Sequence, residues 1–308
     1  MPGRPSSHTR TQVVVVGGGP AGLMLSHLLA RSGIDSVVLD TRSAEEIENT
    51  HRAGILERDS VRLLVESGAS DRVRRDGHEH RGSARGLVED RHQYFREYPY
   101  AWFGVLVQAP ASAPELIYAK SPYGFALISQ RTSDIQRLYF QCDPTDDPRS
   151  WSDDRIWEQL QLRLAGEDGF RLNEGPVIER TVLPFRSFVQ TPLRHRRLLL
   201  AGDAGHTVPP TGAKGLNLAL ADVRALAEVI EQTSRTGDLT SLDAYTPRAL
   251  DRVWREQHFS YWMTTMLHSS PNASDYDEER QLAELRGVVS STAGSAYLAE
   301  GYTGWPQR

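Results

Sequence analysis

The chain has 308 residues, enough for one large domain or two of ordinary size. A hydrophobic fraction of 39% and a charged fraction of 24% are typical of a soluble globular protein. The net charge of −5 gives no reason to expect a nucleic acid partner. The single cysteine, Cys142, excludes an intrachain disulfide and suits a reducing compartment, so we expect a cytoplasmic protein. No apolar run approaches membrane-spanning length, so no membrane partner is expected.

Residues 12–40 carry the pattern of a dinucleotide-binding β–α–β unit. An apolar run at 12–17 predicts a strand, residues 23–31 a helix and residues 36–39 a second strand. Gly17, Gly19 and Gly22 are in G-x-G-x-x-G register, and Asp40 ends the second strand. Glycines here allow a tight turn and the approach of a pyrophosphate to the helix N-terminus, while the acid binds a ribose. The pattern predicts a site for an ADP moiety, without deciding between FAD and NAD.

From Tyr98 onward the pattern becomes that of a β-sheet. A helix is predicted over 56–67, and then WFGVLVQA, ELIYAK, YGFALISQ and RLYFQC read as short antiparallel strands. Ser129 and Arg131 are two residues apart and therefore face one side, with Tyr118 and Tyr139 on neighbouring strands. Periodicity alone favours packed tyrosines and a solvated arginine.

The second half of the chain contains one buried strand pattern among helices. A helix is predicted over 151–164, an extended segment over 181–193, and a strand buried on both faces at 198–201. That strand leads into Gly202-Asp203, a loop rich in Gly and Pro, and a helix from about Gly215. The alternative is an ordinary strand-to-helix turn with Asp203 as a cap, but the length of this loop and its Gly and Pro residues argue against it. Further helices are predicted over 216–233, 240–267 and 275–290.

The Gly-Asp pair and the loop VPPTGAKGLN resemble the flavin motif of the 4-hydroxybenzoate 3-monooxygenase-like FAD-dependent aromatic hydroxylases, the group A flavin monooxygenases. The resemblance implies FAD, with Asp203 at its ribityl chain and the backbone N–H groups of Leu216 and Asn217 facing the flavin. Arg186 matches an arginine that holds the nicotinamide cofactor. The implied cofactor residues are Gly17, Gly19, Ala21, Gly22, Asp40, Thr50, His51, Arg52, Ala53, Gly54, Ile55, Arg186, Asp203, Leu216 and Asn217.

The segment ELIYAKSPYGFALISQR resembles the substrate-binding strands of the same family. The implied substrate residues are Tyr118, Ser129, Arg131, Tyr139 and Pro210. Arg131 and Ser129 would hold a carboxylate, while Tyr118 and the carbonyl of Pro210 would hold a phenol. The implied catalytic residues form a proton relay that ionises the phenol: Tyr118, Tyr302 and His80.

Between His80 and the segment at 98–104 the family carries a long insert that this chain lacks. We therefore expect a large internal deletion after about residue 81, which removes strands and weakens cofactor binding. The expected fold is α/β. It has a truncated Rossmann-like FAD-binding domain (1–93 and 191–222), an antiparallel β-sheet substrate domain (94–190) and a C-terminal helical region (223–308).

The expected reaction is hydroxylation of a 4-hydroxybenzoate-like phenolic acid ortho to the phenol, with FAD, NAD(P)H and O2. An alternative is a catalytically impaired remnant that binds an aromatic acid or FAD weakly. A second alternative is an oxidoreductase whose lost sheet comes from a partner chain. Arg42, after the ribose acid, suggests contact with a 2′-phosphate, yet the choice between NADH and NADPH stays open. No metal is expected, and a homodimer is one option for assembly.

Overall fold

The computed structural model describes residues 10–48, 56–70, 92–166 and 168–305. The chain divides into two compact units. Unit 1 comprises Met1–Tyr94, Phe188–Thr207 and Ala213–Glu256, and unit 2 comprises Phe95–Ser187, Val208–Gly212 and Gln257–Arg308. Residues of the predicted C-terminal region 223–308 therefore occur in both units.

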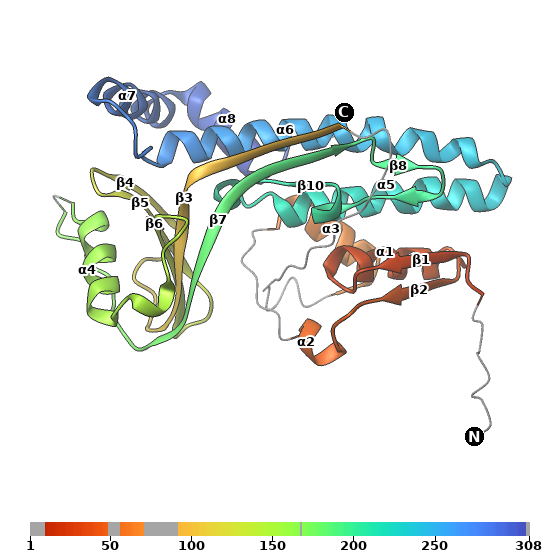
Figure 1. Cartoon of the computed structure of the whole chain (residues 1–308), viewed down its shortest axis with the longest axis horizontal. Helices are drawn as coiled ribbons and strands as arrows, with labels where there is room; N and C mark the ends of the chain where they lie inside the picture. The colour runs from red at the N-terminus through yellow and green to blue at the C-terminus, as the bar shows by residue number, and fades with distance from the viewer. Residues whose placement is uncertain (1–9, 49–55, 71–91, 167, 306–308) are drawn as a thin grey trace. The chain divides into compact units, whose positions relative to one another are not determined.

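Unit 1 is built around a short parallel sheet of β1 (Val13–Val16) and β2 (Ser36–Leu39), connected by α1 (Pro20–Arg31) (Figure 1). The predicted β–α–β unit is thus present. The other elements of unit 1 are α2 (Ala44–Glu48), α3 (Arg58–Glu66), β8 (Arg194–His195), β9 (Leu198–Leu199), η3 (Gly202–Ala204), β10 (His206–Thr207), α5 (Gly215–Thr236), η5 (Leu239–Ala244) and the first part of α6 (Tyr245–Leu267).

Helix α5 is the main partner of α1 in the core of unit 1. Its apolar side, which includes Leu220 and Leu226, packs with Leu25 and Leu29 of α1 in one buried cluster. The helix ends at Gly237, whose φ of 72° is a left-handed conformation that glycine adopts without a steric penalty. The sequence therefore sets both the buried face and the end of this helix.

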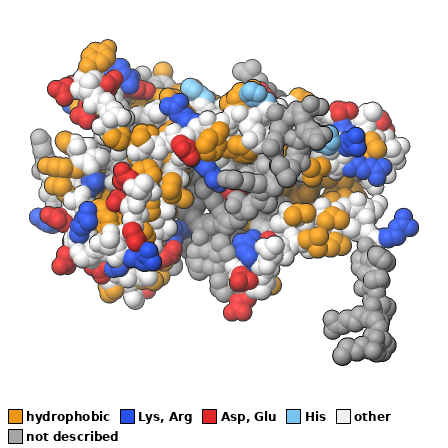
Figure 2. Space-filling model, viewed as in Figure 1, with side chains coloured by type: hydrophobic (Ala, Val, Ile, Leu, Met, Phe, Trp, Pro, Cys, Tyr) orange, Lys and Arg blue, Asp and Glu red, His pale blue; other side chains and the backbone are white. Residues whose placement is uncertain are grey.

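Side chains on one face of the β1–β2 sheet are exposed. Val15 points into the core and is 8% exposed, whereas its neighbours Val14 and Val16 are 55% and 75% exposed. Leu39 of β2 is also exposed, and Figure 2 shows hydrophobic side chains gathered at the surface near these strands. Among the described residues, the β1–β2 sheet has only these two strands. Strands of a parallel sheet are normally buried on both faces, and β1 is buried on one face only.

Unit 2 holds most of an antiparallel sheet with the strand order β10-β7-β3-β6-β5-β4. Strands β3 and β7 are long, and their residues are divided between the two units. The elements with residues in unit 2 are β3 (His92–Gln108), β4 (Ile117–Ser121), β5 (Gly124–Gln130), β6 (Ile135–Cys142), η2 (Pro148–Ser150), α4 (Asp153–Leu164), β7 (Val177–Thr191), η4 (Pro210–Gly212), the end of α6, α7 (Asp275–Ser290) and α8 (Thr292–Thr303).

Both faces of this sheet are buried. Along β5, Ala126 and Ile128 pack with α4 in one cluster, while Phe125 and Leu127 pack with the end of α6 in another. The alternation follows from the two-residue period of a strand. The side that carries Phe125 and Leu127 also receives Tyr302 of α8.

The α/β fold with an antiparallel sheet is confirmed, and the helix predicted over 275–290 coincides with α7. The run 198–201 was expected to be a strand buried on both faces, and this is wrong. Only Leu198–Leu199 form a strand, β9, and Leu198 is 46% exposed. The physical reason is that, among the described strands, β9 pairs only with β8 in a short two-stranded sheet, and not in a larger sheet that lies between two layers. Within the described residues, no helix is long and apolar enough to cross a membrane.

Candidate active site

The turn between β1 and α1 has the geometry that a pyrophosphate requires. Gly17 has a φ of 113°, which disfavours any residue with a Cβ. A Cβ on Gly22 would lie 1.9 Å from the carbonyl oxygen of Gly17, so the helix can approach the strand only with glycine there. Gly19 is the N-cap of α1, and the N–H groups of the following turn, which includes Ala21, have no acceptor within the helix. These features fit the phosphates of a dinucleotide.

Asp40 follows β2 and is fixed beside this turn. Its carboxylate accepts hydrogen bonds from Gly18 N (2.7 Å) and from Arg42 Nη2 (2.9 Å). The Arg42 guanidinium, more than any other group, holds the pKa of the Asp40 carboxyl well below its usual range. Asp40 is therefore ionised at neutral pH and can accept from ribose hydroxyls. Arg42 itself forms an ion pair with Asp40 in this structure.

The Gly-Asp motif lies in η3, where a buried ion pair holds it. Gly202 has a φ of 57° and donates its N–H to Asp222 Oδ2 (2.8 Å). His206 Nε2 lies 2.6 Å from the same oxygen. Burial lowers the pKa of His206, but the nearby Asp222 raises it by more, so the net shift is upward. Asp203 stands half-buried next to this anchored glycine, in the strand-to-helix connection.

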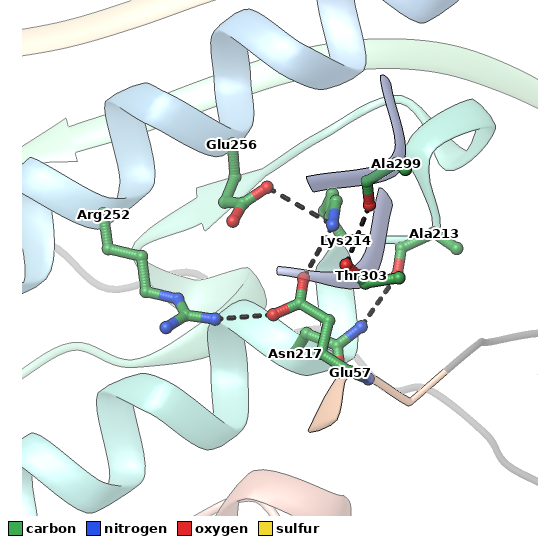
Figure 3. Close-up of polar contacts among 8 residues, drawn as sticks. All are labelled: Glu57, Ala213, Lys214, Asn217, Arg252, Glu256, Ala299 and Thr303. Carbon is green, nitrogen blue, oxygen red and sulfur yellow. Dashed lines mark hydrogen bonds and ion pairs between the residues drawn. The ribbon is translucent and has the colours of Figure 1, made fainter. Parts of the chain in front are cut away.

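The start of α5 holds a group of buried charges that the sequence analysis missed (Figure 3). Lys214, the N-cap of α5, is fully buried, and its Nζ lies 2.7 Å from Glu57 Oε1 and 3.6 Å from Glu256 Oε2. Arg252 Nη2 contacts Glu57 Oε2 at 2.7 Å. Lys214 is one of only two lysines and lies inside the motif VPPTGAKGLN, so the sequence could have indicated it as a site residue. Its acidic partners are far away in the sequence, and no local pattern indicates them.

Asn217 connects this group to the first turn of α5. The backbone N–H of Glu57 donates to Asn217 Oδ1 (2.8 Å), and Asn217 Nδ2 donates to the carbonyl of Ala213 (3.1 Å). Leu216 belongs to the same first turn, whose N–H groups point along the axis with partial positive charge. The start of α5 can therefore face an electron-rich group.

In unit 2, three of the residues expected to bind substrate share one face of the sheet. The register places Tyr118 opposite Leu127 and Leu127 opposite Tyr139, while Ser129 lies opposite Arg137. Opposed residues point to the same side, and so do residues two apart. Tyr118, Ser129 and Tyr139 therefore lie on the side that packs with α6 and α8.

Tyr118 and Tyr302, two of the residues expected to form a proton relay, are in direct contact. Their hydroxyl oxygens are 3.2 Å apart, and Tyr118 Oη donates to the carbonyl of Thr211 at 3.0 Å. Burial raises the pKa of Tyr118 well above its ordinary value. Burial also raises the pKa of Tyr302, although its hydrogen bond with Tyr118 opposes the shift. Both hydroxyls are therefore protonated at neutral pH and able to donate. Pro210 begins η4, the turn that presents the Thr211 carbonyl.

A second arginine stands close to the expected carboxylate site. Ser129 Oγ donates to the carbonyl of Arg137 (2.8 Å), and Arg137 Nη1 donates to Tyr139 Oη (3.3 Å). Arg137 is 8% exposed and forms an ion pair with Glu179 at 3.5 Å. Arg131 lies just past the end of β5, half-buried, and its N–H donates to Ile135 O (2.8 Å). Arg137 was not among the residues predicted from the sequence, although the two-residue period of the strand places it on the same face as Tyr139.

The remaining expected residues are not joined to either group. Arg186 is exposed on β7. The segment Thr50–Ile55, with Thr50, His51, Arg52, Ala53, Gly54 and Ile55, lies outside the described residues. His80 also lies outside them, so the third member of the relay is not placed.

Comparison with known proteins identifies the family. A family model described as FAD binding domain matches residues 10–94 and 87–260. The p-hydroxybenzoate hydroxylase of Acinetobacter baylyi is 34% identical over 387 aligned positions, covering 96% of this chain and 96% of that protein. The p-nitrophenol 4-monooxygenase of Pseudomonas putida has a similar solved structure, with a TM-score of 0.72, 18% identity, and coverage of 96% of this chain and 98% of that chain.

A further solved structure, aklavinone-11 hydroxylase with FAD and aklavinone, has a TM-score of 0.67 at 18% identity, covering 87% of this chain and 71% of that chain. At such identities the two structures show a shared fold. The glycine turn, the ionised Asp40 and the start of α5 fit an FAD cofactor. The chain therefore belongs to the FAD binding domain family and is a flavoprotein aromatic hydroxylase.

Proposed function

We propose that this hydroxylase converts 4-hydroxybenzoate, or a closely similar phenolic acid, to the 3,4-dihydroxy product, with NAD(P)H and O2 as co-substrates. The observation that carries the proposal is the 3.2 Å contact between the hydroxyls of Tyr118 and Tyr302. These residues are 184 positions apart in sequence, so only the fold brings them together. Further support comes from the p-hydroxybenzoate hydroxylase relative, which aligns over 96% of this chain.

The tyrosine pair suits a substrate that must lose a phenolic proton. A phenol has a pKa near 10, so its ionisation at pH 7 costs about 4 kcal/mol. Because both tyrosines keep their own protons, Tyr118 can turn its O–H from the Thr211 carbonyl to a phenolate, while Tyr302 passes a proton onward. His80 would continue the relay. FAD, when bound, supplies the oxygen chemistry, and the protein supplies placement and charge.

The other end of the substrate requires a cation. Ser129 lies on the same face as Tyr118, and Arg131 follows it by two residues. A charge-assisted hydrogen bond from a guanidinium to a carboxylate contributes roughly 1.5–3 kcal/mol. In this proposal Arg131 and Ser129 bind the carboxylate, Tyr139 lies between the two ends, and the Pro210 carbonyl accepts from the phenol.

The experiment compares 4-hydroxybenzoate with phenol in the purified, FAD-loaded protein, following NAD(P)H oxidation and dihydroxylated product. Arg131→Leu should raise KM for 4-hydroxybenzoate by roughly 10–100-fold, the equivalent of one charge-assisted hydrogen bond. Arg155→Leu is the matched control, because Arg155 lies over the Trp151 ring on the other side of the sheet. Equal turnover of phenol and 4-hydroxybenzoate by the wild-type protein would overturn the substrate assignment.

A second candidate is a form that binds an aromatic acid but holds FAD weakly. The exposed side chains of Val14 and Val16 favour it, because they leave the cofactor-binding sheet uncovered on one face. The absorbance spectrum of the purified protein separates the candidates. A yellow protein supports the hydroxylase, and a colourless one that takes up added FAD only at high concentration supports the weak binder.

A further inference from the structure

The group at the start of α5 contains two carboxylates, and Glu256 is the one whose ionised form is poorly stabilised by its surroundings. Both oxygens of Glu57 are satisfied, one by Lys214 Nζ and the other by Arg252 Nη2, each at 2.7 Å. Glu256 is 1% exposed, and its Oε2 lies 3.6 Å from Lys214 Nζ without a hydrogen bond partner. Burial of a carboxylate, with one oxygen left without a hydrogen bond, favours its protonated form.

The charges around Glu256 come from three elements. Lys214 is contributed by the start of α5, Glu57 by the residue before α3, and Arg252 by the preceding turn of α6. Burial raises the pKa of Glu256 to about 7; Glu57 adds to the shift, while Lys214 and Arg252 oppose it. The two cations and Glu57 leave a net charge of +1 when Glu256 is protonated and zero when it is ionised.

This change of charge occurs beside a helix start that fits the cofactor. Lys214 is the N-cap of α5, and Asn217 in the first turn binds the Glu57 backbone. Reduction of a flavin adds negative charge to its pyrimidine ring, and a positive charge nearby favours that form. A positive charge at this helix start therefore discriminates between oxidised and reduced FAD.

We propose that Glu256 is a positioning residue whose proton sets the net charge of the Lys214 group, and thereby how strongly the protein prefers reduced over oxidised FAD. The inference rests on FAD binding and is independent of the choice of aromatic substrate. Protonated Glu256 favours reduced FAD, and ionised Glu256 removes that preference.

The test measures the dissociation constants of oxidised and reduced FAD, anaerobically, between pH 5.5 and 8.5. A unit charge acting over roughly 10 Å at an effective dielectric constant of about 20 changes such an equilibrium by about tenfold. In the wild-type protein the preference for reduced FAD should fall by about tenfold as pH rises through 7. Glu256→Gln should lack this step and at pH 8.5 should prefer reduced FAD about tenfold more than wild type.

Asp251→Asn is the matched control, since Asp251 lies on the same helix but is 69% exposed and paired with Arg255. It removes one negative charge at the surface and should keep the step. A Glu256→Gln protein with the wild-type pH dependence would overturn the proposal, and so would a wild-type protein that binds neither form of FAD.

A second readout uses the protein without FAD. The infrared spectrum at pH 5.5 should contain a protonated buried carboxyl band that disappears by pH 8.5 and is missing from Glu256→Gln. If that variant does not fold, the wild-type protein decides alone. A wild type with neither the carboxyl band nor the pH step contradicts the inference, whereas one that shows both supports it.

Discussion

The sheets of the two units differ in how completely they are covered. In unit 2, β5 reads Gly124–Gln130 with five successive buried residues, because helices pack on both faces. In unit 1, β1 alternates, with Val15 buried and Val14 and Val16 exposed. A parallel strand with one bare face is unusual, since such strands normally lie between layers. Among the described residues, the sheet of unit 2 is therefore covered on both faces, whereas one face of the β1–β2 sheet of unit 1 stays exposed.

The alignment with the Acinetobacter protein is relevant to this difference. It extends over 387 positions, which exceeds the 308 residues of this chain, so that relative carries residues without a counterpart here. A deletion after about residue 81 remains a prediction. It would explain the exposed valines, because lost strands leave faces and edges unburied.

The largest expected effect lies in the covered sheet. Phe103 on β3 is 0% exposed and stacks on Phe140. Phe103→Ala should cost about 3–5 kcal/mol in the free energy of unfolding, because it removes buried area and leaves a cavity. Phe95→Ala on the same strand is the control: Phe95 is 58% exposed and should lose less than about 1 kcal/mol. Urea denaturation measures both, and similar losses would refute the assignment of a covered core.

The second effect concerns the buried charges of unit 1. Glu256 has its pKa raised from 4.5 to about 7, so the folded state binds more protons than the unfolded state between those values. Stability must then fall as pH rises through this window. Between pH 5 and pH 8 the loss from this one group is about 2–3 kcal/mol.

Glu256→Gln should remove this part of the pH dependence. The variant should gain about 2–3 kcal/mol relative to wild type on going from pH 5 to pH 8. Parallel unfolding curves for the two proteins across that range would show that Glu256 does not titrate there. Asp251→Asn, at an exposed site, should keep the wild-type slope.

Features that depend on neighbouring residues could be predicted from the sequence, and features that depend on tertiary burial could not. The glycine turn, Asp40 and the helix at 275–290 depend on local spacing, and all three occur as expected. Tyr118 and Tyr302 were paired by resemblance, and the structure brings their hydroxyls together. Glu256 could not be found, because burial next to Lys214 raises its pKa, and sequence spacing carries no information on burial.

The failure at 198–201 has the same origin. Four apolar residues in succession predict a strand buried on both faces, but that outcome needs neighbours on both sides. Here β9 pairs only with β8 among the described strands, and Leu198 stays exposed. An apolar run indicates that a segment is suited to a buried position. It does not show whether the rest of the chain packs on both of its faces.

The third prediction addresses the cofactor. Asp203 is half-buried next to Gly202, which Asp222 anchors. If Asp203 accepts from the ribityl hydroxyls, Asp203→Ala should weaken FAD binding by about 10–100-fold, equivalent to roughly 1.5–3 kcal/mol. Fluorescence quenching of added FAD measures the affinity. Asp243→Ala, an exposed acid of unit 1 that pairs with Arg194, should bind FAD as the wild type does.

The fourth prediction separates the effect of Tyr118 on stability from its effect on catalysis. Tyr118→Phe removes a hydrogen bond to the Thr211 carbonyl and should cost about 1 kcal/mol in stability. It should leave carboxylate binding intact but abolish ionisation of the bound phenol and most of the hydroxylation. The measurement is a pH titration of bound-substrate absorbance with product yield. Tyr123→Phe, at a position 56% exposed, is the control, and a hydroxylating Tyr118→Phe protein would rule out the relay.

The smallest expected effect on stability concerns Val16, on the exposed face of β1. Val16 is 75% exposed, so Val16→Lys should change the free energy of unfolding by no more than about 0.5 kcal/mol. A charge placed on this exposed apolar face should also reduce self-association, because hydrophobic contact then requires desolvating an ammonium group. Sedimentation at increasing concentration measures this, with Val289→Lys, at an exposed position of α7, as the control. If Val16→Lys instead destabilises the protein by 2 kcal/mol or more, then residues of this chain or of a second copy cover β1, and the cofactor unit is more complete than its described strands show.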